Sequence, residues 1–211
     1  GVKCALSELG VSLITVGGGN LNDPRFNDIQ RNRAFDLINT DDFDGIIFQS
    51  GSLYNFITEE QFLTFCSRFA AIPSVHIGYK KSGLSSISAD NKMGMRELVD
   101  HFIEEHNRKE IAFIRGPKGS SDADERYDAY KDSLEAHGIP YCEDLVFTGK
   151  FLPESGTAAV RNIMYIKRHH FDAMIGANDH MALFAMNELL RRGKKVPGDV
   201  IIGGFDNLIS A

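Results

Sequence analysis

The sequence has little of what marks disulfide-bonded, metal-binding or membrane proteins. Its 211 residues contain no tryptophan, and the three cysteines, Cys4, Cys66 and Cys142, are an odd number without metal-ligand spacing. We expect them to be buried structural thiols in a reducing compartment. No apolar run is long enough to span a membrane, and no signal peptide is present. The sequence therefore predicts a cytoplasmic protein with no membrane partner, while Gly1 at the start leaves open a removed leader or upstream domain.

Concentrated charge of one sign is missing as well. The chain carries 23 Lys and Arg residues against 29 Asp and Glu residues, a net charge of −6, and it has no basic run. Proteins that bind nucleic acids neutralise phosphates with clustered Lys and Arg. We therefore expect this piece to be a poor nucleic-acid binder by itself.

What the sequence does have is a regular alternation of short apolar runs and amphipathic segments. The clearest case is residues 173–177, an apolar run typical of a strand buried on both faces of a parallel sheet. Asn178 and Asp179 follow it, and the apolar spacing then becomes helical until Gly193. We expect Asp179 to cap this helix. Asn178 stands at the carboxyl end of a strand, where open α/β sheets bind ligands, although a purely capping and turning role remains an alternative.

The same alternation runs through the whole chain and predicts an α/β fold with parallel sheets flanked by helices. The expected strands are residues 11–16, 45–50, 73–78, 111–115, 145–148, 173–177 and 200–206. The expected helices are residues 4–10, 24–40, 58–70, 91–106, 122–137, 153–167 and 179–190. A polar, serine-rich stretch at 80–88 looks like a connector. We therefore predict two Rossmann-like lobes, 1–88 and 89–211, with the first strand of one and the return segments of the other missing.

Side chains at the predicted strand ends are suited to a hydroxylated ligand. Carboxylate, amide and guanidinium groups such as those of Gln49, Arg126 and Asp206 can bind neighbouring hydroxyls in pairs. Phe151 adds an apolar face on which a ring can stack. This mixture fits a polyhydroxylated or ring-shaped ligand better than a metal ion or an acyl group.

Catalytic, metal and cofactor sites are not indicated. No Gly-x-Ser-x-Gly elbow is present, and the glycines at 17–19 lack the spacing of a phosphate-binding loop. His169 and His170 are adjacent, so they do not share a helix face, and no acidic partner stands at ligand spacing. We expect both histidines to be solvated, and we predict no metal, no cofactor and no enzymatic activity.

Six short motifs in order resemble one family. They are Asp90-Asn-x-x-Gly94, residues 101–117, Glu125-Arg126-x-x-Ala-Tyr130, Ala177-Asn-Asp-x-Met-Ala182, Gly193-x-x-Val-Pro197-x-Asp-Val200 and Gly204-Phe-Asp206-Asn207. Together they resemble the effector-binding core of LacI/GalR-type regulators, which has the type I periplasmic-binding-protein fold. The match runs from about residue 4 to residue 207. Gly78 and the His106-Asn107 step depart from the usual pattern.

The resemblance implies two lobes that close around a small effector, often a sugar or a nucleoside-like compound, in a homodimer. It also implies DNA binding only through a separate helix-turn-helix domain, which this sequence does not contain. The ligand contacts that it implies are Gln49, Asp122, Arg126, Phe151, Asn178 and Asp206. Two alternatives stay open: the sensor region of a histidine kinase or diguanylate cyclase fusion, and a solute-binding protein for sugar transport. The unpaired cysteines and the Pro-x-Asp-Val motif count against the transport protein.

Overall fold

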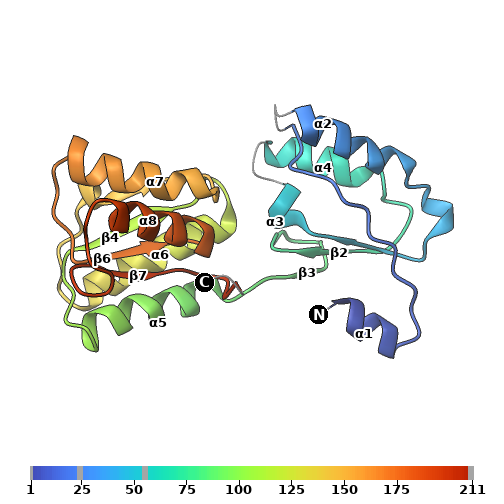
Figure 1. Ribbon diagram of the computed structural model, residues 1–211. Coiled ribbons are helices and arrows are strands. Elements are labelled where there is room, and N and C mark those ends of the chain that lie inside the picture. The colour runs from blue at the N-terminus through green and yellow to red at the C-terminus, as the bar shows by residue number, and fades with distance from the viewer. Residues whose placement is uncertain (1, 23–25, 54–56, 209–211) are drawn as a thin grey trace. The chain divides into compact units, whose positions relative to one another are not determined.

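The computed structural model describes residues 2–22, 26–53 and 57–208, which form two compact units (Figure 1). Unit 1 comprises residues 1–77 and 81–86, and unit 2 comprises residues 78–80 and 87–211. Each unit combines helices with a sheet, so the predicted α/β class is confirmed. The lobe boundary at residue 88 stays a prediction.

Unit 1 contains a small sheet with strand order β1-β2-β3. Its elements are α1 (Val2–Glu8), α2 (Phe26–Asn32), short 3-10 helices at Arg33–Leu37 and Thr40–Asp42, β1 (Ile46–Phe48), α3 (Ser50–Leu53), α4 (Glu59–Ser67), β2 (Ser74–Ile77) and β3 (Ser86–Ile87). Strands β1 and β2 are parallel, with Ile46 opposite Ser74. Thr58 caps α4 as predicted, because its hydroxyl accepts from the Gln61 N–H while the Gln61 side chain accepts from the Thr58 N–H.

Two expectations for unit 1 are wrong, and a third is incomplete. Residues 11–16 form no strand, and Ile14 is 68% exposed, because no strand in the described residues pairs with this apolar run. The predicted connector also supplies a short strand, β3, next to β2, and the Ser85 carbonyl accepts from the His76 N–H. The helix predicted over 24–40 ends at Asn32 and continues as a 3-10 turn, which leaves Leu37 exposed and buries Phe35.

The cysteines are only partly as expected. All three are free, but Cys4 is exposed, and only Cys66 and Cys142 are half-buried. Burial raises the pKa of the Cys66 thiol to about 11. Cys66 is therefore a structural thiol, whereas Cys4 is not a buried one.

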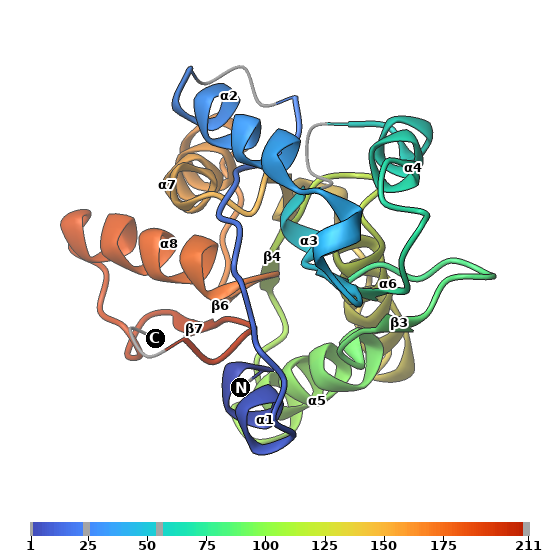
Figure 2. The same ribbon diagram turned by 90° about the vertical axis from the view of Figure 1, so that its right-hand side faces the viewer.

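Unit 2 contains a four-stranded, wholly parallel sheet with strand order β5-β4-β6-β7. Its elements are α5 (Asn91–Glu104), β4 (Ile111–Arg115), α6 (Ser121–Ala136), a 3-10 turn at Glu143–Leu145, β5 (Val146–Thr148), α7 (Pro153–Arg161), a π turn at Asn162–Ile166, β6 (Ala173–Gly176), α8 (Asp179–Arg191) and β7 (Ile201–Gly203). Helices α7 and α8 cover one face of the sheet, and α5 and α6 cover the other (Figures 1 and 2). The four strands predicted for this region are confirmed.

The core of unit 2 lies around β4 and β6, the two central strands. Phe113, Ile114, Met174 and Ile175 are fully buried. Tyr130 stacks on Phe113 with ring centroids 4.6 Å apart, and its hydroxyl donates to the backbone carbonyl of β4 at 2.9 Å. Burial raises the pKa of the Tyr130 phenol. This hydrogen bond satisfies a polar group that would otherwise be costly to bury, and it fixes α6 on the sheet.

Within the three described ranges, every helix is too short or too polar to cross a bilayer.

Candidate functional site

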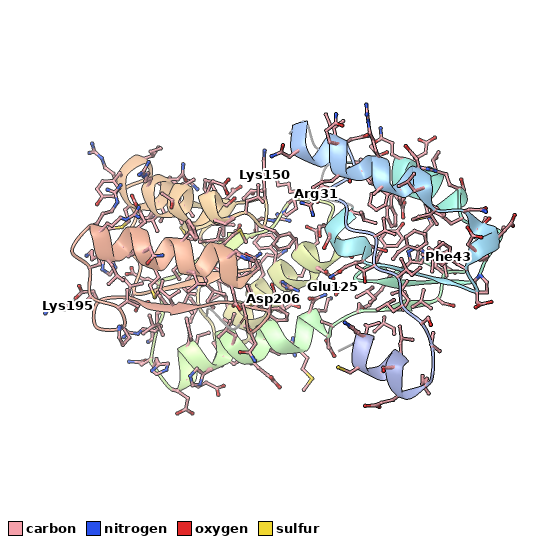
Figure 3. All side chains as sticks on the ribbon, turned by 45° about the vertical axis from the view of Figure 1, so that its right-hand side comes forward. Arg31, Phe43, Glu125, Lys150, Lys195 and Asp206 are labelled. Carbon is pink, nitrogen blue, oxygen red and sulfur yellow. The ribbon has the colours of Figure 1, made fainter. Side chains whose placement is uncertain are left out.

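The carboxyl ends of the four strands of unit 2 meet at one edge of its sheet, because the strands are parallel. Phe151 follows β5, Asn178 follows β6 and Asp206 follows β7, while Asp122 and Arg126 lie in the first turns of α6 after β4. In Figure 3, Asp206 and Glu125 lie toward this edge, and Lys195 lies at the opposite end of α8. Five of the six predicted ligand contacts therefore belong to one edge of one unit.

Arg126 is the central cation of this edge and is only 6% exposed. Its Nη1 donates to the Ala177 carbonyl at 2.6 Å and lies 3.5 Å from a carboxylate oxygen of Asp206. Its Nε donates to Asn91 at 2.8 Å. In the described part of the chain its Nη2 makes no hydrogen bond, and this atom is not fully buried. Nη2 is therefore a donor of Arg126 that no described group occupies.

Burial and neighbouring charges act on Arg126 in opposite directions. Desolvation lowers the pKa of its guanidinium, and the carboxylates around it, Asp206 and Asp122 first, raise it. An arginine stays charged in proteins even when it is desolvated. The result is a buried positive charge with several carboxylates near it, which is electrostatically suited to a neutral, hydroxylated ligand.

The Phe205 ring holds the guanidinium in place. The Arg126 Cζ lies 3.9 Å from the Phe205 ring centroid, within the range of a cation–π interaction. The ring fits against α5 because Gly94 has no side chain there, and a Cβ at Gly94 would lie 2.9 Å from the ring. Neither Phe205 nor its contact with Arg126 was predicted, although both Gly94 and Phe205 stand in the motifs quoted above.

Asn91 is a second residue of this edge that was not predicted from the sequence. It is 1% exposed, and its amide nitrogen donates to Asp122 at 2.8 Å and to Glu125 at 2.9 Å. Its amide oxygen accepts from Arg126. All of these bonds join the first turn of α5 to the first two turns of α6. Asp122 is thereby held by a buried amide, and its other oxygen is left to accept hydrogen bonds.

Asn178, not Asp179, is the N-cap of α8, which corrects the prediction. The Asn178 side-chain oxygen accepts from the Met181 N–H at 3.0 Å, and its amide nitrogen donates to the Phe151 carbonyl at 3.1 Å. Asp179 is the first helical residue, and its carboxylate accepts from the Leu208 N–H at 2.7 Å. Asn178 therefore has the capping role that was the alternative to a ligand role. Both polar atoms of its amide already have hydrogen-bond partners.

Phe151 is held in an unusual backbone conformation. Its φ of 59° lies in the left-handed region, which a bulky residue rarely adopts. Its ring packs over Gly116, where a Cβ would lie 2.4 Å from the ring. Backbone strain of this kind persists only where the surroundings enforce it, and it is concentrated at functional sites. The structure thus places a half-buried aromatic ring beside Arg126, whose Cζ is 6.0 Å from the ring centroid.

Asp206 shares this left-handed geometry, with a φ of 112°. Its side chain keeps 38% of its surface exposed while one oxygen faces Arg126. Burial raises the pKa of the Asp206 carboxyl, and Arg126 opposes that rise. The Asp206 carboxylate therefore has one oxygen near a fixed cation and an exposed surface that can accept further hydrogen bonds.

Gln49 is the one predicted contact that lies in unit 1. It follows β1 and is exposed, and its backbone carbonyl accepts from the Ser52 N–H at 3.1 Å. The position is the carboxyl end of a parallel strand, as predicted. That Gln49 shares a ligand with the residues of unit 2 across a cleft stays a prediction.

The sequence pattern of one known family, the periplasmic binding protein-like domain, matches residues 99–211, just over half of the chain. The chain belongs to this family. Its curated relatives include the HTH-type transcriptional regulator AscG of Escherichia coli (strain K12), which is 36% identical over 132 residues, covering 63% of this chain and 39% of AscG. Another is the HTH-type transcriptional regulator CelR of Thermobifida fusca, 34% identical over 142 residues, covering 65% of this chain and 41% of CelR.

A solved structure of a transcriptional regulator CelR–cellobiose complex matches 98% of this periplasmic binding protein-like chain and 60% of its own, with 29% identity and a TM-score of 0.78. A solved sugar-binding transcriptional regulator of the LacI family from Escherichia coli matches 100% of this chain and 72% of its own, with 28% identity and a TM-score of 0.70. The resemblance to the effector-binding core of LacI/GalR-type regulators is therefore confirmed. The chain spans about two fifths of the length of the curated regulators named above.

Proposed function

We propose that this chain is the effector-binding region of a LacI/GalR-type transcriptional regulator and that its effector is a small polyhydroxylated molecule such as a sugar. The single observation that carries the proposal is the set of polar groups around Arg126. One guanidinium nitrogen remains available to donate, and Asp206 and Asp122 each have an oxygen available to accept. Hydroxyls both donate and accept, so neighbouring hydroxyls of one ligand match this set.

Two further observations support a sugar over other small molecules. The Phe151 ring is half-buried at the same edge, and the apolar face of a sugar ring packs on aromatic side chains. The regulator in the similar CelR–cellobiose complex binds a disaccharide. A nucleoside-like effector is the second candidate, because its base would use the same ring and its ribose the same acceptors.

The remaining proposals concern the longer regulator of which this chain would be a part. We propose that it acts in the cytoplasm as a homodimer, binds DNA through a separate domain, and uses the present chain for binding and not for catalysis. The relatives that carry this proposal are HTH-type transcriptional regulators. An apolar surface on unit 2 supports dimerisation, since Tyr165 and Ile166 on the π turn after α7 and Phe184 on α8 remain 44–74% exposed.

A thermal-shift screen of sugars, nucleosides and amino acids tests the effector class. A ligand present at a hundred times its dissociation constant should stabilise the fold by about 2.7 kcal/mol. We expect a mono- or disaccharide to give this shift, and we expect Gln49→Ala to weaken its binding in calorimetry. Gln30→Ala, an exposed glutamine on α2, is the matched control and should bind normally. A shift produced only by amino acids, or by none of the three classes, would contradict the proposal.

A further inference from the structure

Three side chains of different metal-binding types come together at the amino-terminal edge of the unit 2 sheet. Cys142 and Asp144 belong to the turn that leads into β5, and His169 belongs to the turn that leads into β6. One ligand atom of each, a thiol sulfur, a carboxylate oxygen and an imidazole nitrogen, all lie within 4.8 Å of one another. The candidate effector contacts lie after the strands, so this cluster is at the opposite edge of the sheet.

The backbone holds these three residues in position. Cys142 is the N-cap of the 3-10 turn, packs against the core of unit 2, and its carbonyl accepts from the Leu145 N–H at 3.1 Å. His169 follows the π turn at the end of α7, and its N–H donates to the Ile163 carbonyl at 3.0 Å. Arg168 turns the chain with a φ of 58°. The three ligand atoms are therefore brought together by ordered backbone and not by chance contact of long side chains.

The distances suit a small tetrahedral ion. Zinc bonds of about 2.0–2.3 Å to nitrogen, oxygen and sulfur place neighbouring ligand atoms about 3.3–3.7 Å apart. The His169 Nε2 lies 3.2 Å from an oxygen of Asp144, close to that edge length, and the Cys142 sulfur lies within 4.8 Å of both atoms. We propose that Cys142, Asp144 and His169 form a zinc-type transition-metal site, with water in the fourth position. His169 has no acidic partner at ligand spacing in the sequence, and the fold supplies one 25 residues away in Asp144.

The competing explanation is a plain ion-pair cluster. Lys167 lies 3.4 Å from the other oxygen of Asp144 and donates to the Glu143 carbonyl at 3.2 Å, so it already neutralises this carboxylate. That account explains Lys167, Asp144 and His169 without a metal. It gives no role to the Cys142 sulfur, which is the softest ligand of the set and the one that favours zinc over Ca²⁺ or Mg²⁺. In the metal site Lys167 would instead hold the second oxygen of a bound carboxylate and orient it.

The test is a titration of the full chain, stripped with chelator and kept reduced, with Co²⁺ and Zn²⁺. We expect one Co²⁺ per chain with a thiolate charge-transfer band in the near ultraviolet, displacement of Co²⁺ by Zn²⁺, and a Zn²⁺-dependent rise in Tm that EDTA reverses. Cys142→Ser should remove the band, and His169→Gln should remove the Tm shift. Circular dichroism checks that both variants fold.

Two matched controls come from the chain itself. Cys4→Ser removes an exposed cysteine, and His170→Gln removes the neighbouring histidine, which pairs with Glu110 outside the cluster. Both should bind Co²⁺ as the parent chain does. The proposal is overturned if Co²⁺ binds without a thiolate band, if Cys142→Ser keeps the parent affinity, or if either control abolishes binding.

Discussion

The Asn178 side chain donates to the backbone carbonyl of Phe151 at 3.1 Å. This bond joins the loop after β6 to the loop after β5, and the same amide caps α8 through the Met181 N–H. One side chain therefore anchors a helix and the backbone of the proposed stacking aromatic.

The first prediction follows from this double role. Asn178→Ala removes a helix cap and leaves the Phe151 carbonyl without its partner, so we expect a loss of about 2–4 kcal/mol in the free energy of unfolding. Asn178→Asp keeps a capping oxygen but cannot donate to the carbonyl, so it should lose distinctly less. Urea unfolding of the two variants measures this. Equal losses would mean that the cap contributes nothing.

The second prediction concerns how ligand recognition divides between Phe151 and Asp206. Phe151→Leu should weaken affinity and leave discrimination between epimers largely intact, because stacking is not specific for hydroxyl stereochemistry. Asp206→Ala should reduce that discrimination, since loss of one hydrogen-bond partner in a closed site costs about 1–3 kcal/mol.

Calorimetry with a bound sugar and its epimer decides the second prediction. Asp128→Ala, a carboxylate of α6 that pairs with Lys131, is the control and should leave both affinities unchanged. If Asp206→Ala weakens the sugar and its epimer by the same factor, Asp206 does not read a hydroxyl and serves only to end its turn.

The third prediction uses Glu188, a carboxylate on α8 that is 3% exposed. Hydrogen bonds from Arg161 and then Arg192 lower the pKa of the Glu188 carboxyl. A lowered pKa means that the stabilising contribution is present above the ordinary glutamate pKa and is lost as pH falls through the lowered one. Glu188→Gln should therefore unfold at lower urea concentration than the parent chain at neutral pH, and the difference should shrink on acidification.

Urea midpoints across a series from neutral to strongly acidic pH measure this difference. Glu135→Gln, at an exposed position of α6, is the control and should follow the parent chain throughout. A Glu188→Gln deficit that stays constant down to the lowest pH would show that the ion pairs do not stabilise the fold.

The fourth prediction places a dimer contact on unit 2. Phe184 is 44% exposed on α8 and shares a groove with Ile166 and Phe147. Burying such a side chain against a second copy stabilises association, and a charge there would have to be buried without a partner. Phe184→Asp should therefore shift the parent protein from dimer to monomer in light scattering. Leu37→Asp, 84% exposed in unit 1, should not.

The helices and strands of unit 2 could be predicted because the apolar spacing of the sequence agrees with the side chains that the fold buries. The strand at 111–115 was predicted to the residue, and Asp90 caps α5, whose apolar face is buried at Met95 and Val99. In unit 1, the apolar run at 11–16 looked like a strand, but a strand also needs a neighbour that pairs with its backbone. Apolar spacing carries no information about whether that neighbour is present.

The sequence could indicate the site residues that follow strands, but it could not indicate the residue whose contacts depend on how two helices pack. The family resemblance named Asp122, Arg126, Phe151 and Asp206, and the parallel topology brings all four to one edge of the unit 2 sheet. Asn91 was missed because a polar residue in the first turn of a helix looks like ordinary helix-start chemistry. Its contacts with Asp122, Glu125 and Arg126 depend on how α5 packs against α6, and spacing within one helix does not reveal that.

The left-handed backbone at Phe151 and Asp206 limits how this edge of the unit 2 sheet can be re-engineered. Arg126 and Asn91 support the fold as well as the site, so a mutant library aimed at new ligands should leave them fixed. Variation then falls on positions 151 and 206, where glycine and asparagine fit the backbone and β-branched residues do not. The backbone conformation at positions 151 and 206 therefore restricts which side chains this edge can present to new ligands, whatever chemistry those ligands require.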